Sequence, residues 1–85
     1  MQISLKFFAS VRETLGVADE IVTLPESVST VGAVRAHLVA RGGVWADALA
    51  DTRPLRMAFN HVMCGPQTAI SENGEVAFFP PVTGG

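Results

Sequence analysis

The chain has 85 residues, enough for one small domain, and 48% of them are hydrophobic while only 16% are charged. The net charge is −2 and the six basic residues are scattered, which argues against a nucleic-acid partner. The single cysteine cannot form an internal disulfide, and no signal peptide or apolar run of membrane length is present, so we expect a cytoplasmic protein with no membrane partner.

The first predicted element is a strand over residues 2–9. Ile3, Leu5 and Phe7 alternate with polar residues and therefore share one face of that strand. Phe8 breaks the alternation, because it places a large aromatic side chain on the polar face. Such a residue is either covered by a loop or part of a contact surface, and the sequence leaves both readings open.

Ser10 and Glu13 have the spacing of a capping box, which predicts a short helical turn that ends at Gly16. A second strand is predicted over residues 19–24, paired antiparallel with the first. Ser29 is the predicted N-cap of the main helix, which spans residues 30–41. The apolar stripe of this helix contains Val31, Val34 and Leu38. Two glycines, Gly42 and Gly43, are expected to end it.

The rest of the chain predicts short elements. In chain order they are one or two helical turns within 44–53, a strand over 55–60, a turn or short strand over 61–64, a bridge at Ile70 and a last strand over 76–79. Asn73-Gly74 is a tight-turn signal just before the last strand. One main helix packed on one face of a mixed sheet of four to five strands is an α+β roll, with residues 1–85 as its only domain.

Built-in catalysis is not indicated. His61 and Cys64 have H-x-x-C spacing, but a metal site needs three or four converging ligands, so we expect no metal here. His61 is then a surface residue and Cys64 an inert core residue. No Ser/His/Asp or Cys/His set is recognisable. These features indicate that the chain carries a reactive group rather than a catalytic pocket.

The C-terminal residues, Phe-Phe-Pro-Pro-Val-Thr-Gly-Gly at 78–85, provide such a group. Pro80 and Pro81 lack a backbone N–H and are expected to leave the sheet as an extended strut. Residues 80–85 would form a flexible tail that reaches about 20 Å from the body. Gly84 and Gly85 have no Cβ and fit a narrow channel, and the terminal carboxylate is their one reactive group. The alternative is a disordered terminus without a role.

Three stretches of the sequence resemble known proteins: residues 7–13 (FFASVRE), 58–60 (AFN) and 75–85 (EVAFFPPVTGG). The chain is similar to the ubiquitin-like β-grasp proteins and, among them, most similar to the small subunits of molybdopterin synthase. The similarity covers the whole chain, and the final run is its most specific part. The match is loose over 61–65.

The resemblance implies a non-catalytic sulfur carrier in molybdenum cofactor synthesis. An activating enzyme similar to ubiquitin-activating enzymes uses ATP to adenylate Gly85, and a sulfur donor protein converts the adenylate to a thiocarboxylate. The tail then enters the large subunit of a heterotetrameric synthase, which holds the catalytic pocket, and sulfur passes to cyclic pyranopterin monophosphate. The chain itself is expected to bind no cofactor.

The resemblance also suggests roles for individual residues. Gly85 carries the sulfur, and the residues expected to thread into the partner are Pro80, Pro81, Val82, Thr83 and Gly84. The predicted apolar docking patch consists of Phe8, Met63 and Phe79, with Arg12 as a polar contact at its rim. Ordinary core packing is the alternative for each of the three apolar residues.

Three rival functions remain open at this stage. One is a sulfur carrier for thiamine synthesis or tRNA thiolation, which would share the Gly-Gly end. Another is a ubiquitin-like modifier that forms isopeptide bonds with lysines after the same activation step. The last is a plain binding domain whose tail has no role.

Overall fold

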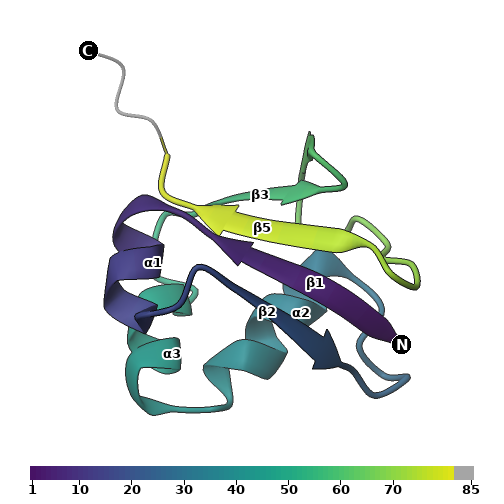
Figure 1. Cartoon of the computed structure of the whole chain (residues 1–85), viewed down its shortest axis with the longest axis horizontal. Coiled ribbons are helices and arrows are strands. Elements are labelled where there is room, and N and C mark those ends of the chain that lie inside the picture. Colours follow the sequence, from purple (N-terminus) through teal and green to yellow (C-terminus); the bar gives the residue numbers. More distant parts are fainter. Residues whose placement is uncertain (82–85) are drawn as a thin grey trace.

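The computed structural model describes residues 1–81 of the chain. Its elements are β1 (Gln2–Phe7), α1 (Ala9–Leu15), β2 (Asp19–Thr23), α2 (Val31–Val39), α3 (Gly43–Leu49), β3 (Arg56–Phe59), β4 (Val62–Cys64) and β5 (Glu75–Phe79). The strands form one five-stranded sheet in the order β2-β1-β5-β3-β4, shown in Figure 1. The central strands β1 and β5 are parallel, whereas every other pair is antiparallel. This topology confirms the predicted α+β roll with a mixed sheet.

One face of the sheet carries the hydrophobic core. Ile3, Leu5 and Phe7 of β1 are almost completely buried, as their alternation predicts, and Phe7 lies opposite Phe78 of the parallel β5. The two rings stack with centroids 6.4 Å apart. All three helices contribute apolar side chains to the same core cluster, and Figure 1 shows them on one side of the sheet. Within residues 1–81 no helix covers the opposite face, here called the outer face.

The helical layer contains the predicted main helix, α2, and two shorter helices where the sequence predicted only helical turns. The described residues contain α2 with nine residues and two further helices, α1 and α3, with seven residues each. Helices α1 and α3 lie at the end of the sheet where β1 and β5 finish. Each contributes two buried side chains, which close the core at that end. The short apolar segments 9–15 and 43–49 look like isolated turns in the sequence, since their helices are stabilised by packing rather than by length.

The predicted helix caps were displaced. The capping box was wrong: Phe8 is the N-cap of α1 and has no side-chain cap bond, so Ser10 lies within the helix. The assignment of Ser29 was also wrong, because the Oγ1 of its neighbour Thr30 accepts from the backbone N–H of Ala33 at 3.1 Å. Ser29 and Thr30 both have a hydroxyl group that can cap a helix. Thr30 is the cap because the helix begins with the apolar stripe at Val31, directly after it.

The boundary between α2 and α3 and the bridge near Ile70 also differ from expectation. Helix α2 ends at Val39, before the predicted glycines. Gly42 has φ of +75° and serves as the N-cap of α3, whose first residue is Gly43. The isolated bridge forms at Ala69, opposite Thr30, while Ile70 is buried in the core. The tight turn at Asn73-Gly74 is present, and Asn73 has φ of +63°.

A buried arginine joins α2 to the end of α3. Arg35 is only 8% exposed, and its Nε donates to the carbonyl of Leu49 at 2.7 Å. Its Nη2 donates to the carbonyls of Ala50 and Arg53. The last carbonyls of a helix have no partner within it, so this guanidinium satisfies groups that would otherwise be buried unpaired. Arg35 therefore fixes the backbone of residues 49–53, which runs towards the site described below.

Gly32 provides a test of the packing between α2 and the loop after β4. A Cβ built on Gly32 would lie 2.8 Å from the Cβ of Pro66 and 3.0 Å from its carbonyl oxygen. We expect Gly32→Ala to lower the free energy of unfolding by about 1–2 kcal/mol, because overpacking against backbone outweighs the helix-propensity gain of about 1 kcal/mol. Urea denaturation measures this change. Ala36→Gly, at an exposed position of the same helix, isolates the propensity effect, and a stabilised Gly32→Ala variant would contradict the packing account.

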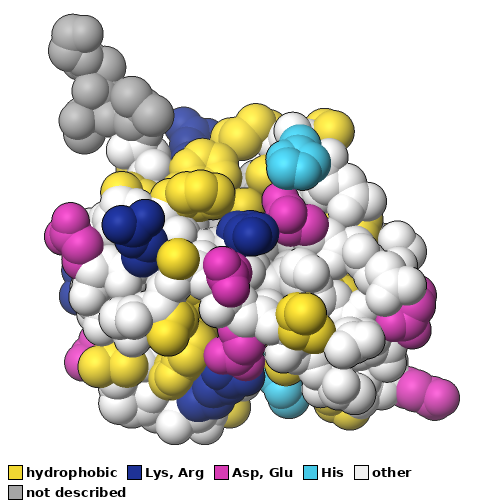
Figure 2. Space-filling view, in the orientation of Figure 1, with side chains coloured by type: hydrophobic (Ala, Val, Ile, Leu, Met, Phe, Trp, Pro, Cys, Tyr) yellow, Lys and Arg dark blue, Asp and Glu magenta, His cyan; other side chains and the backbone are white. Residues whose placement is uncertain are grey.

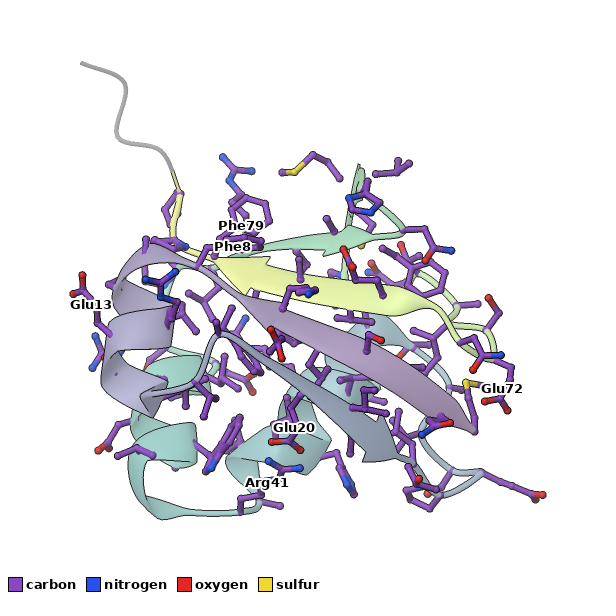
Figure 3. All side chains as sticks on the ribbon, viewed as in Figure 1. Phe8, Glu13, Glu20, Arg41, Glu72 and Phe79 are labelled. Atoms are coloured by element: carbon purple, nitrogen blue, oxygen red, sulfur yellow. The ribbon has the colours of Figure 1, made fainter. Side chains whose placement is uncertain are left out.

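A second test concerns the ion pair between β2 and the segment after α2. Arg41 donates from Nη1 and Nη2 to the two carboxylate oxygens of Glu20, at 3.0 and 2.6 Å, and its guanidinium lies 4.4 Å from the ring centroid of Trp45. These hydrogen bonds lower the pKa of Glu20 below its ordinary value, although burial of the carboxylate acts in the opposite direction. Figure 3 shows the two side chains facing each other.

The lowered pKa of Glu20 gives the sign of a pH dependence. Because the pKa is lower in the folded state, the stabilisation is complete above the ordinary glutamate pKa of about 4.3 and is lost as the pH falls through the folded-state pKa. Both side chains are about 30% exposed, so we expect Glu20→Gln to cost at most ~1 kcal/mol at pH 7. Urea denaturation at pH 7 and pH 3 should show the difference shrinking at the lower pH. A difference that is equal at both pH values would contradict the prediction.

Candidate docking surface and C-terminal segment

The C-terminal segment leaves the body at the end of the central strand β5. Phe79 is the last residue of that strand, and Pro80 and Pro81 follow it (Figure 1). Both prolines are half-buried, so this part of the predicted strut lies against the body. The remaining predicted tail residues, including the sulfur-bearing position, lie outside the described residues: Val82, Thr83, Gly84 and Gly85.

Phe8 and Phe79 lie together at the root of this segment. Their rings meet edge to face with centroids 6.3 Å apart, and Figure 3 shows both side chains at the end of β5. Phe8 is 48% exposed, so no loop in residues 1–81 covers it. Of the two readings that the sequence leaves open for Phe8, the structure therefore favours a contact surface.

Met63 lies on the same outer face at the other side of β3. In the sheet register Met63 is opposite Ala58, and Ala58 is opposite Ala77 of β5. The two alanines are buried, because their side chains are short and larger neighbours surround them. Met63, by contrast, is 58% exposed. We call these five residues the outer-face patch: Phe8, Met63, Phe79, Ala58 and Ala77. Figure 2 shows hydrophobic side chains gathered beside the point where the described chain ends.

Two arginines border the outer-face patch. The backbone N–H of Arg12 donates to the carbonyl of Phe8 at 3.3 Å, which places Arg12 one helical turn from Phe8 on α1. Arg56 lies opposite Phe79 in the register of β3 and β5. Both arginines are exposed. Sequence reasoning identified Arg12 but missed Arg56, which the alternation of β3 would have placed on the outer face with Ala58.

A groove of about 280 Å³ lies on the other side of the same root. Its lining is mostly apolar and comes from α1, the end of α3, segment 53–55 and the two prolines: Ser10, Val11, Thr14, Ala48, Arg53, Pro54, Leu55, Pro80 and Pro81. The C-terminal segment therefore leaves the body between the outer-face patch and this groove. Sequence reasoning missed the groove, because its walls are distant from one another along the chain.

The two residues considered as metal ligands are separated by the sheet. His61 is exposed in the turn between β3 and β4, with its Nε2 3.5 Å from a carboxylate oxygen of Glu75. Cys64 packs half-buried against the core on the other face. Within residues 1–81, no group of three His, Cys, Asp or Glu side chains is close enough to hold a metal ion. No helix in this part of the chain has the length and apolar character needed to cross a membrane.

The topology, the one-sided helical layer and the C-terminal segment that follows the central strand define a ubiquitin-like β-grasp protein. Residues 5–85 match the model of the ThiS family, and the chain belongs to that family. It is 40% identical over 83 residues to molybdopterin synthase sulfur carrier subunits from Haemophilus influenzae and Escherichia coli, covering 98% of this chain and 99% of each relative.

A solved structure with the same fold comes from a complex. It is the protein–protein complex of subunits 1 and 2 of the molybdopterin-converting factor from Helicobacter pylori. The matched chain of that complex has a TM-score of 0.66 and 18% sequence identity, and the match covers the whole of both chains. At this identity the likeness establishes the fold.

Proposed function

We propose that this chain is the sulfur carrier subunit of a molybdopterin synthase, with Gly85 as the residue that carries the sulfur. The observation that carries the proposal is the 40% identity to two sulfur carrier subunits over nearly the full length. The geometry of the described residues supports it, because the exit point of the C-terminal segment is bordered by the exposed Phe8 and the half-buried Phe79. An exposed apolar surface of this kind is typical of a protein that binds a partner.

In the proposed chemistry the chain supplies the acyl group and its partners supply the catalysis. An oxygen of the Gly85 carboxylate attacks the α-phosphorus of ATP on the activating enzyme, and pyrophosphate leaves. The carboxylate is a poor electrophile, whereas the resulting acyl-adenylate has AMP as a good leaving group. A sulfur nucleophile from a donor protein then attacks the acyl carbon and displaces AMP. When that nucleophile is the terminal sulfur of a donor persulfide, the product is an acyl disulfide, and attack of a thiol on the donor sulfur breaks the S–S bond. This leaves a thiocarboxylate on Gly85 and a new disulfide between the donor and the thiol.

The second half of the cycle takes place in the large subunit. The tail enters the catalytic pocket of that subunit, and the sulfur passes to cyclic pyranopterin monophosphate. Pro80 and Pro81 hold the start of the tail against the body, so that Val82, Thr83 and Gly84 can reach into the partner while the outer-face patch docks. The narrow backbone of the glycines suits a channel that would exclude a side chain.

Reconstitution with purified proteins tests this proposal. The carrier is incubated with its activating enzyme and a sulfur donor, with and without ATP, and its intact mass is measured. We expect an exchange of one oxygen for sulfur at Gly85 that requires ATP, and loss of that sulfur when the large subunit and cyclic pyranopterin monophosphate are added. A carrier that is sulfurated but keeps its sulfur under these conditions would favour a thiamine or tRNA acceptor. A carrier that joins lysines instead would be a modifier.

A further inference from the structure

The basic residues of the chain divide into two groups by their contacts. Lys6 and Arg41 form ion pairs with Asp19 and Glu20, and the guanidinium of Arg35 is buried against backbone carbonyls. The other three form no ion pair within residues 1–81: Arg12, Arg53 and Arg56. All three lie at the end of the body where the C-terminal segment leaves, two at the outer-face patch and one at the groove.

Arg53 is held in place at the groove by its backbone and by one of its nitrogens. Its carbonyl accepts from the buried Arg35 at 2.9 Å, and its own Nε donates to the carbonyl of Asp47 at 3.0 Å. The first bond fixes the backbone of Arg53 and the second fixes its Nε, and within residues 1–81 no hydrogen bond uses its two Nη atoms. The groove that Arg53 lines has about 280 Å³, at the lower end of typical ligand pockets of roughly 300–1,000 Å³, and its mostly apolar lining can accept an apolar side chain.

We propose that the groove and the two arginines on either side of the tail root, Arg53 and Arg56, form a second docking element for the synthase large subunit. It receives a loop that inserts one apolar side chain into the groove and places carboxylates against the guanidinium groups. Pro80 and Pro81 form one wall of the groove, so a partner that encloses the residues after Pro81 must contact both sides of the root. The inference rests on the proposed function, because the proposed function identifies the large subunit as the partner.

Titration calorimetry with the large subunit from the same organism tests the second docking element. The double variant Arg53→Gln/Arg56→Gln is compared with wild type at low and high salt. The control is Arg41→Gln, which removes positive charge at a residue already paired within the chain and away from the outer-face patch. We expect the double variant to bind about tenfold more weakly at low salt, and this difference to shrink at high salt as exposed charges are screened. If the double variant binds as tightly as Arg41→Gln, the proposal is overturned.

Two further measurements separate the possible failures. Arg56→Gln alone removes no hydrogen bond of the described residues, so it keeps the test valid if loss of the Arg53 side chain unfolds the protein. Wild type is first sulfurated with the activating enzyme, ATP and the sulfur donor, and failure of that step would count against the proposed function itself. If wild type is sulfurated and the arginine variants lose affinity only for the activating enzyme, the assignment to the large subunit is wrong.

Discussion

We expect deletion of Gly84 and Gly85 to abolish sulfur transfer and to leave the free energy of unfolding within about 0.5 kcal/mol of wild type, as for a surface change. The buried core extends from Ile3 to Phe78, so the folded body is complete before the deleted residues. The deletion removes the carboxylate from the position at which the activating enzyme forms the adenylate. Mass spectrometry after incubation with the activating enzyme, ATP and sulfur donor measures transfer, and urea denaturation measures stability.

Gly85→Ala is the matched control for this deletion, because it keeps the chain length and the carboxylate while adding one methyl group. We expect it to slow adenylation, because the added methyl group must fit the proposed narrow channel that receives the terminal glycines. Some adenylation should remain. Normal sulfur transfer by the deletion variant would show that the terminal glycines are not the reactive end. That result would favour the reading of the chain as a binding domain with a passive tail.

We expect the second large effect from Phe8→Ala, on binding of the large subunit. Phe8 is half-exposed and meets Phe79 edge to face at the root of the C-terminal segment. Truncation of a central aromatic residue in an interface costs about 2 kcal/mol or more, which corresponds to a roughly 30-fold loss of affinity. We expect a smaller loss of folding stability, because the side chain lies outside the core. Calorimetry with the large subunit and urea denaturation give the two quantities.

Ile21→Ala is the control for Phe8→Ala. Ile21 is a highly exposed apolar residue on β2, the edge strand at the opposite side of the sheet from β4. Its truncation removes a similar kind of surface away from the root of the C-terminal segment, so we expect no loss of affinity. If Phe8→Ala binds the large subunit as tightly as Ile21→Ala does, the outer-face patch is not the docking surface.

Strand periodicity explains why most of the fold could be predicted. Side chains alternate strictly between the faces of a strand, so Ile3, Leu5 and Phe7 determine the core face of β1, and Phe8 stands out at once. The same regularity predicted β3, whereas β5 was predicted as the apolar run that follows the Asn73-Gly74 turn signal. Helix boundaries were less accurate, because a difference of one residue, as between Ser29 and Thr30, depends on local packing rather than on residue type.

Part of the candidate site could be predicted because some of its residues have a recognisable signal in the sequence. The other residues have no such signal. Phe8 was visible in the sequence because it breaks the strand alternation, and Phe79 because it directly precedes the Pro-Pro strut. Arg35 gave no such signal, because its acceptors are backbone carbonyls, which every residue possesses. The groove was equally hidden, since only the folded chain brings the segments 10–14 and 53–55 to the two prolines.

The most direct test of the sulfur-carrier account is the intact mass of the protein purified from its native cells. The account predicts a fraction heavier by one sulfur-for-oxygen exchange, and fragmentation should place that exchange at Gly85. Cells that are actively making molybdenum cofactor are the appropriate source, because the thiocarboxylate is consumed and renewed during synthesis. An unmodified mass in such cells, or a modification at any residue other than Gly85, would contradict the account.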